Sequence, residues 1–144
     1  MMRKVVLAAT WVVWLHVLVT ILHAVAHFGA HVLPASFFDD AFIVVVIFSA
    51  PVVALFLLKN AHLSRLGALL LFLSMFGALL YGLVNHFLLP GADNATHMSP
   101  GVWQLPFLVT SYLLLILEVA GSSVGLWGLF VREAYKRAVL RQGS

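Results

Sequence analysis

The sequence predicts an all-α integral membrane protein, a four-transmembrane-helix antiparallel bundle that forms one domain over residues 1–144. Of its 144 residues, 63% are hydrophobic and only 9% are charged, whereas about 25% of residues in soluble domains are charged. The mean hydropathy is +1.09. A membrane span needs about 20 mainly apolar residues, and four segments approach or exceed that length: 5–28, 41–58, 66–89 and 106–131.

The distribution of charge predicts the orientation of the bundle. All the basic side chains fall on one side of the predicted membrane, namely Arg3, Lys4, Lys59, Arg65, Arg132, Lys136, Arg137 and Arg141. By the positive-inside rule, both termini are expected to be cytoplasmic. The same distribution argues against nucleic acid as the partner of this basic chain, and indicates the lipid bilayer, most simply a prokaryotic plasma membrane.

The first segment carries the most informative pattern in the chain. His16, His23, His27 and His31 are spaced by 7, 4 and 4 residues, which places their side chains on one face of a helix. Polar side chains at membrane depth are costly and normally face a bundle interior, a partner or a water-filled cavity. Imidazoles gathered on one face indicate a site for a transition metal or a haem iron.

The second segment is rich in Phe, Ile and Val and carries no ionisable side chain within its span. It contains Pro51, so we expect it to be kinked or less tilted than the others. Asp39 and Asp40 precede it, where they can cap the start of the helix. The short connection 59–65 requires the second and third segments to be antiparallel neighbours.

Small residues lie on one face of each of the last two segments. Gly82 belongs to such a face in the third segment, and Gly121, Gly125 and Gly128 form one in the fourth, with Gly121 and Gly125 as a GxxxG pair. Small residues let another helix or a flat group approach closely. Plain helix packing is the simpler interpretation.

A candidate metal site lies at the outer end of the predicted bundle. His23 and His27 are one helical turn apart, so both can bind one ion. His86 lies three residues before the outer end of the third segment, at a similar depth. Loop residues can complete the site, namely His31, His97, Asp93, Asp39 and Asp40. The alternative is that these imidazoles only hydrogen-bond to carbonyl groups or to interfacial water.

The residues leave the identity of the centre open between a bare ion and a haem. Histidine together with carboxylate suits zinc, copper or iron. In architecture alone, the chain resembles the small four-helix membrane cytochromes, a resemblance that implies b-type haem held by histidines on neighbouring helices. The predicted outer side, however, offers no Arg or Lys to the haem propionates.

A second polar pair is predicted near the middle of the membrane. Glu118 lies near the centre of the fourth segment and His16 at a comparable depth on the first. An unpaired carboxylate in hydrocarbon is costly, so we expect the two to form a hydrogen bond or an ion pair. The pair can serve as a proton relay, as a quinone contact, or simply as a lock between two helices.

Three functions remain open from the sequence. The first is a histidine-ligated centre facing outward and used in electron transfer, in a homo-oligomer or as a small subunit of a larger redox membrane complex. The second is transport of protons or metal ions along a path lined by His and Glu. The third is a structural accessory subunit with no chemistry. The chain has no cysteine, which excludes disulfides, thiolate ligands and iron–sulfur clusters.

Overall fold

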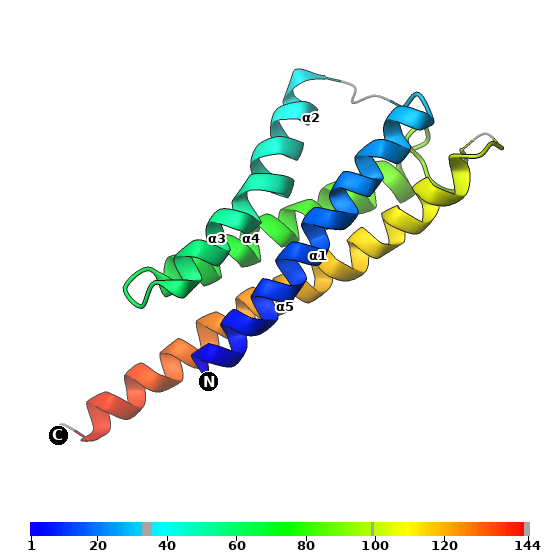
Figure 1. Cartoon of the computed structure of the whole chain (residues 1–144). Helices are drawn as coiled ribbons and strands as arrows, with labels where there is room; N and C mark the ends of the chain where they lie inside the picture. Colours follow the sequence, from blue (N-terminus) through cyan, green and yellow to red (C-terminus); the bar gives the residue numbers. More distant parts are fainter. Residues whose placement is uncertain (33–35, 99, 143–144) are drawn as a thin grey trace.

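The computed structural model describes residues 1–32, 36–98 and 100–142, and the side chains of the last helix as far as Val131. Over these residues the fold is all-helical, with no strand. Two of the four long helical stretches contain a π-helical segment, written η. The elements in order are α1 (Met2–Gly29), α2 (Phe37–Phe42), η1 (Ile43–Ser49), α3 (Ala50–Lys59), α4 (Ser64–Leu83), η2 (Val84–Leu88) and α5 (Gln104–Gln142) (Figure 1).

Four helical stretches are long and apolar enough to cross a membrane: Met2–Gly29, Phe37–Lys59, Ser64–Leu88 and Gln104–Val131. Each end of the spans predicted from the sequence lies within four residues of the observed one. Large apolar side chains such as Trp11, Leu22 and Phe56 are at least half exposed on the surface of the bundle, which is typical of a protein that meets lipid. The all-helical fold with four membrane-length helices is confirmed.

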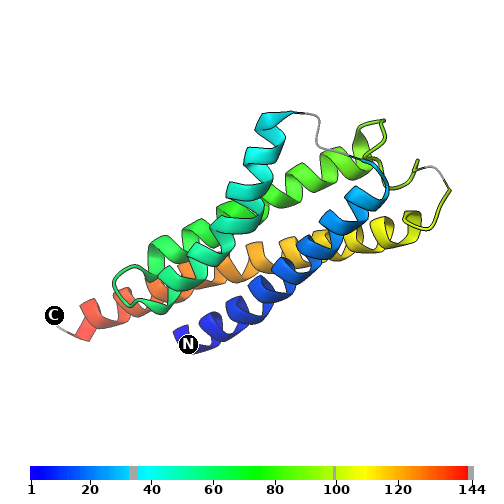
Figure 2. The same ribbon diagram turned by 45° about the horizontal axis from the view of Figure 1, so that its top comes forward.

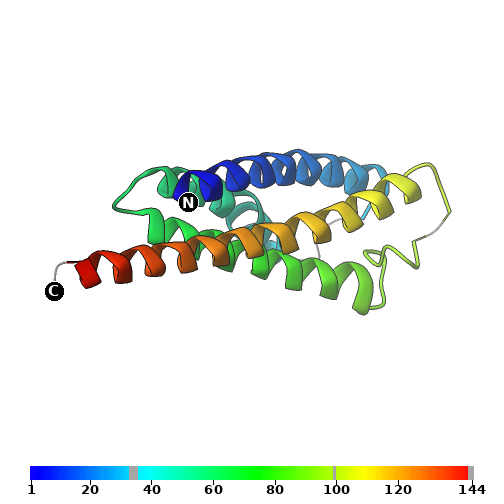
Figure 3. The same cartoon turned by 90° about the horizontal axis from the view of Figure 1, so that it is seen from below.

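Helix α5 lies at the centre of the arrangement. It packs along both α1 and α4, and α3 packs against α4. Figure 3 shows α5 running between α1 and α4 over much of its length. The two termini and the turn between α3 and α4 lie at one end of the bundle, called here the inner end, and the other two connections lie at the opposite, outer end (Figures 1 and 2).

The inner half of the bundle is closely packed. Its core is formed by side chains from three helices: Ala9, Val13, Ala54, Leu55, Leu58, Ala68, Leu71 and Met75. A Cβ atom added to Gly125 would lie 2.6 Å from the backbone nitrogen of Phe72, and one added to Gly67 would lie 2.5 Å from that of Leu58. Glycine at these positions therefore allows the helix backbones to come closer than any side chain would permit.

The small residues of the last two spans do not all serve this packing. Gly121 faces Met75 in the core, and a Cβ on Gly128 would lie 3.1 Å from that of Ala68. A Cβ on Gly82, in contrast, would make only ordinary contacts, the nearest at 3.7 Å from Glu118 Oε2. Gly82 instead borders a cavity described below.

The outer half of the bundle is more open. Helix α2 diverges from α1 towards the outer end, as Figures 1 and 2 both show. The irregularity in this span lies just before Pro51, where η1 replaces the α-helical hydrogen-bonding pattern. The proline has no N–H to donate, and its ring crowds the preceding turn. The predicted disturbance at Pro51 thus takes the form of a π-helical segment.

A second π-helical segment, η2, ends the third span. The N–H of Leu89 donates to the carbonyl of Val84, five residues earlier, at 2.8 Å. Such wide turns are rare and occur frequently at functional sites. His86 lies at the centre of η2 and is 7% exposed, so this unusual turn presents an imidazole to the interior of the bundle.

Candidate metal centre

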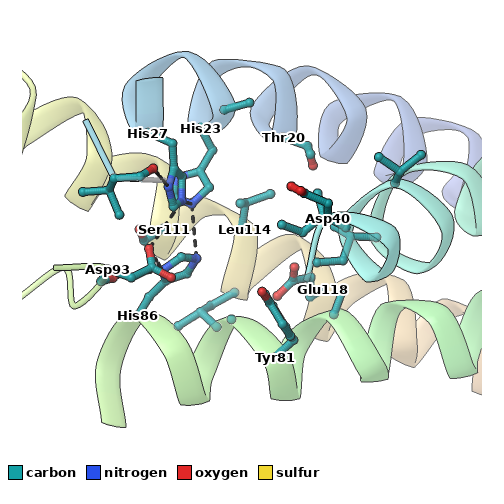
Figure 4. A pocket seen from close by; sticks show the side chains of 18 of the residues that line it. Thr20, His23, His27, Asp40, Tyr81, His86, Asp93, Ser111, Leu114 and Glu118 are labelled. Atoms are coloured by element: carbon teal, nitrogen blue, oxygen red, sulfur yellow. Dashed lines mark hydrogen bonds and ion pairs between the residues drawn. The ribbon is translucent and has the colours of Figure 1, made fainter. Parts of the chain in front are cut away.

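Three imidazoles from two spans meet at the outer end of the bundle. His23 and His27 come from α1, and His86 comes from η2. His23 Nε2 lies 3.1 Å from His27 Nε2 and 3.2 Å from His86 Nε2. One ligand atom from each of the three rings lies within 4.8 Å of the other two, and Figure 4 shows the rings turned towards one another. The predicted meeting of these three residues is confirmed.

Two of the rings are held by backbone carbonyl groups. His27 Nδ1 lies 3.0 Å from the carbonyl oxygen of Val32, and His86 Nδ1 lies 3.1 Å from that of Asp93. A carbonyl oxygen can only accept a hydrogen bond. Both Nδ1 atoms therefore carry the proton and donate it, which leaves the Nε2 atom of each neutral ring with a lone pair.

The third ring is held by a hydroxyl group. His23 Nδ1 lies 2.8 Å from Thr110 Oγ1 on α5. The hydroxyl of Thr110 can donate either to the carbonyl of Pro106, at 2.7 Å, or to His23. This contact holds the His23 ring so that its Nε2 atom faces the other two imidazoles.

These contacts bring the three Nε2 atoms together. A proton on His23 Nε2 can be donated to one of its two neighbours at 3.1 or 3.2 Å, whereas a metal ion in its place can bind all three nitrogens. Zinc–nitrogen bonds of about 2.0–2.1 Å place tetrahedral ligands about 3.3–3.4 Å apart, close to the observed separations. Metal-bound histidines also typically donate their second N–H to a carbonyl, carboxylate or water. The donor set therefore fits a transition-metal ion.

The turn after α1 explains how Val32 reaches its position. The helix ends at Gly29, and His31 adopts a positive φ of 57°, a conformation that few residues other than glycine adopt. The chain then folds back so that Val32 N–H donates to the carbonyl of His27 at 3.0 Å. Val32 is thus bonded to both the backbone and the ring of His27. His31 itself is exposed and shapes this turn without joining the three rings.

Asp93 lies beside the three imidazoles. Its Oδ1 atom is 3.1 Å from His86 Nδ1 and 3.5 Å from His27 Nε2. The loop that carries it is fixed to the end of the third span, because Ala95 N–H donates to the carbonyl of His86 at 2.8 Å and buried Asn94 donates to that of Leu89 at 2.9 Å. Asp93 contacts two of the three rings, and the ion-binding group consists of the rings themselves.

A cavity of about 600 Å³ adjoins the metal centre, between α1, η1, α4 and α5. The three histidines and Asp93 line one end of it. Thr20, Asp40, Tyr81 and Glu118 line the part that extends towards the middle of the bundle, and most of the remaining wall is apolar (Figure 4). This volume falls within the range of about 300–1,000 Å³ that is usual for small-molecule sites.

The mid-membrane pair is close but incompletely bonded. His16 Nε2 lies 3.6 Å from Glu118 Oε1, a separation that allows an ionic contact but is too long for a hydrogen bond. His16 is fully buried and Glu118 is 2% exposed. Glu118 Oε2 and Thr20 Oγ1 have no hydrogen-bond partner among the described residues.

The structure places the other predicted outer-site residues elsewhere. His31 and His97 line a second cavity of about 340 Å³ that the three ligand histidines do not line. His97 Nδ1 lies 3.1 Å from Asn94 Oδ1. Asp39 accepts a hydrogen bond from the Tyr81 hydroxyl at 3.2 Å. Of the two aspartates before the second span, only Asp40 lines the larger cavity.

Sequence reasoning missed the groups that orient the rings. These groups are the Thr110 hydroxyl and the Val32 carbonyl. The sequence does place Thr110 one turn after Pro106, but only the packing of α1 against α5 shows that it faces His23. No family model, curated protein or solved structure matches this chain at significant similarity. The geometry of the site therefore carries the functional argument.

Proposed function

We propose that this chain is an integral membrane protein that binds one transition-metal ion on His23, His27 and His86, near the outer face of the membrane. The observation that carries the proposal is that His23 Nε2 lies within 3.2 Å of both His27 Nε2 and His86 Nε2, while the Nδ1 atoms of His27 and His86 donate to backbone carbonyl groups. The positive-inside rule supports an outward-facing centre, because the basic residues gather at the opposite end of the bundle.

Zinc is the ion that fits best. Three histidine nitrogens with one further position for water or substrate is the usual arrangement of catalytic zinc. Copper and iron also accept imidazole ligands, and an electron-transfer role would require one of them, since zinc has no redox chemistry. Identification of the bound metal therefore also tests the choice between redox and other chemistry.

Haem fits the three rings less well than a single ion. Two imidazoles bound on opposite faces of a haem iron are separated by two metal–nitrogen bonds, about 4 Å in total. His23 Nε2 is closer than this to both of its neighbours. His23 contacts the other two rings edge to face, with centroids 4.6 and 4.9 Å apart, which leaves no space for a macrocycle between His23 and either neighbour.

A transport path through the bundle is less well supported. The cavity extends from the metal centre towards Glu118, but the inner half beyond it contains the closely packed core around Leu71 and Met75. Gly121 and Gly125 bring α5 directly against α4 in this region. A path for ions would require these helices to separate, whereas binding of an ion at the outer end requires no movement.

Metal analysis of the purified protein tests the proposal. We expect about one zinc per chain by atomic spectroscopy, and no Soret band in the absorption spectrum. Substitution of His23, His27 or His86 with alanine should abolish binding of the metal. His31→Ala and His97→Ala are matched controls that should retain it. A full metal content in His86→Ala, or a metal-free wild-type protein after incubation with zinc, would refute the proposal.

A further inference from the structure

We propose that the metal centre hydrolyses an ester of an amphipathic, lipid-like molecule that enters the cavity sideways from the outer leaflet. This inference rests on the proposed function, because it requires the ion on His23, His27 and His86. Water is the second substrate. Its oxygen adds to the ester carbonyl carbon, the bond from that carbon to the alcohol oxygen breaks, and the products are a carboxylic acid and an alcohol.

The first argument is the open coordination position. The protein supplies three nitrogen ligands, and the cavity reaches all three rings. A zinc ion held by these three nitrogens would have room for one further ligand, and the adjoining cavity could supply a water molecule or the carbonyl oxygen of a substrate. A zinc ion with three protein ligands lowers the pKa of its bound water to about 7 and polarises carbonyl groups.

The second argument is a carboxylate placed to take a proton from that water. Asp93 Oδ1 is buried and accepts no hydrogen bond, although His86 Nδ1 lies 3.1 Å away, because the N–H of that atom is directed at the Asp93 carbonyl oxygen. Asp93 Oδ1 also lies 3.5 Å from His27 Nε2, one of the three atoms that would bind the ion. Asp93 is therefore the general base, and it returns the proton to the departing alcohol.

The third argument is the place where the cavity reaches the surface. Phe28 on α1 and Val44 on η1 both line the cavity, yet they are 68% and 58% exposed. The cavity thus opens between these two elements, on the side of the bundle that faces lipid. Phe28 belongs to the last turn of α1, so the opening lies at the depth of the outer leaflet. A substrate with an apolar chain can enter there without crossing water.

The far end of the cavity indicates what the buried end of the substrate carries. Glu118 Oε2 and Thr20 Oγ1 are unpartnered, and both residues line the cavity. Thr110 holds the His23 ring, and Glu118 comes eight residues later on α5, which is about 12 Å along the helix axis. A hydrogen-bond donor such as a hydroxyl group, at about that distance from the scissile carbonyl, would satisfy Glu118.

Two matched esters test these arguments together. The para-nitrophenyl esters of decanoic acid and of its terminally hydroxylated analogue differ only in the distal hydroxyl group, which lies about ten bonds from the carbonyl carbon, or about 12 Å at about 1.2 Å per bond. We expect the zinc-loaded protein to hydrolyse both, and kcat/KM to be about 10- to 100-fold higher for the hydroxylated ester, because its hydroxyl group would pair with a buried oxygen that otherwise has no hydrogen-bond partner.

Three variants separate the roles of the residues. Asp93→Asn should keep its zinc and lose about 100-fold or more in kcat. Glu118→Leu, which places an apolar side chain of similar size in the membrane, should keep its zinc and its activity on the plain ester but lose the preference for the hydroxylated one. His97→Ala should behave as wild type in every assay.

The outcomes distinguish this inference from the proposed function. A protein that binds zinc through the three histidines but hydrolyses neither ester faster than His86→Ala would overturn the inference and leave the metal site standing. Loss of zinc in Asp93→Asn would also overturn it, because the carboxylate would then be a ligand that fills the fourth position. If wild type and Glu118→Leu prefer the hydroxylated ester over the plain one to the same degree, Glu118 does not bind the distal hydroxyl group, and the assigned substrate class is wrong.

Discussion

His23 Nδ1 lies 2.8 Å from Thr110 Oγ1, across the contact between α1 and α5. This hydrogen bond holds the orientation of the ring at the centre of the three imidazoles. Thr110→Val keeps the shape of the side chain and removes the hydroxyl group. We expect its zinc affinity to fall about 10- to 100-fold, the usual effect of losing a hydrogen bond to a ligand ring, when measured by competition with a chelator in detergent.

Thr110→Ser is the matched control for this prediction. It retains the hydroxyl group and should retain an affinity close to that of wild type, although it loses one methyl group from the contact with α1. If the valine variant binds zinc as tightly as the serine variant does, the Thr110 hydroxyl does not orient the ring.

The close approach of α5 to α4 gives a prediction about stability. A Cβ atom on Gly125 would lie 2.6 Å from the Phe72 backbone nitrogen and 2.8 Å from its Cα atom, and neither backbone atom can move without shifting a helix. Gly125→Ala should therefore lower the free energy of unfolding by about 1–3 kcal/mol, measured by denaturation in mixed micelles.

Gly77 provides the comparison on α4. A Cβ atom there would meet only the Val46 and Phe42 side chains, at 3.7 and 3.8 Å. Gly77→Ala should be neutral, or should stabilise the helix by up to about 1 kcal/mol through the higher helix propensity of alanine. Equal effects of the two substitutions would show that the backbone contact at Gly125 does not limit the packing.

The orientation of the bundle can be tested because the chain has no cysteine. Single cysteines at Ala61, in the turn between α3 and α4, and at Ala92, in the loop before α5, fall at exposed positions on opposite ends of the bundle. In intact cells, a membrane-impermeant thiol reagent should label Ala92→Cys and should label Ala61→Cys only after lysis. The reverse pattern would place the metal centre on the cytoplasmic side and contradict the positive-inside interpretation.

The coarse structure and the grouping of the three histidines could be predicted because they depend on local spacing and depth. Four apolar segments of membrane length define the helices, and residues four apart on one helix, such as His23 and His27, necessarily share a face. Matching the depth of His86 to that of these two residues required only the lengths of the spans. His31 continues the same spacing, yet it falls beyond Gly29, where the helix has ended.

The finer features depend on contacts between distant segments. The five residues of η2 include no glycine or proline that would mark the wide turn at His86, and the cavity beside Gly82 lies between segments far apart in the sequence, namely α1, η1, α4 and α5. Thr110 and the Val32 carbonyl reach the rings through the packing of α5 and a turn with positive φ. Spacing along one chain segment carries no information about such contacts.

Metal binding should stabilise the outer half of the bundle, because the three ligands join α1 to the end of the third span. A ligand that binds only the folded state adds about 2.7 kcal/mol when its free concentration is 100 times Kd. Zinc should therefore raise the midpoint of thermal unfolding of the wild-type protein, and removal of the metal with a chelator should reverse the increase.

In His86→Ala, which loses the connection to the third span, zinc should leave the midpoint unchanged. His97→Ala, with its substitution in the neighbouring loop, should respond to zinc as wild type does. A zinc-dependent increase of equal size in His86→Ala would mean that the metal binds elsewhere. Besides His86, the only side-chain nitrogen in η2 is that of Asn85, and this amide donates to the Tyr81 carbonyl.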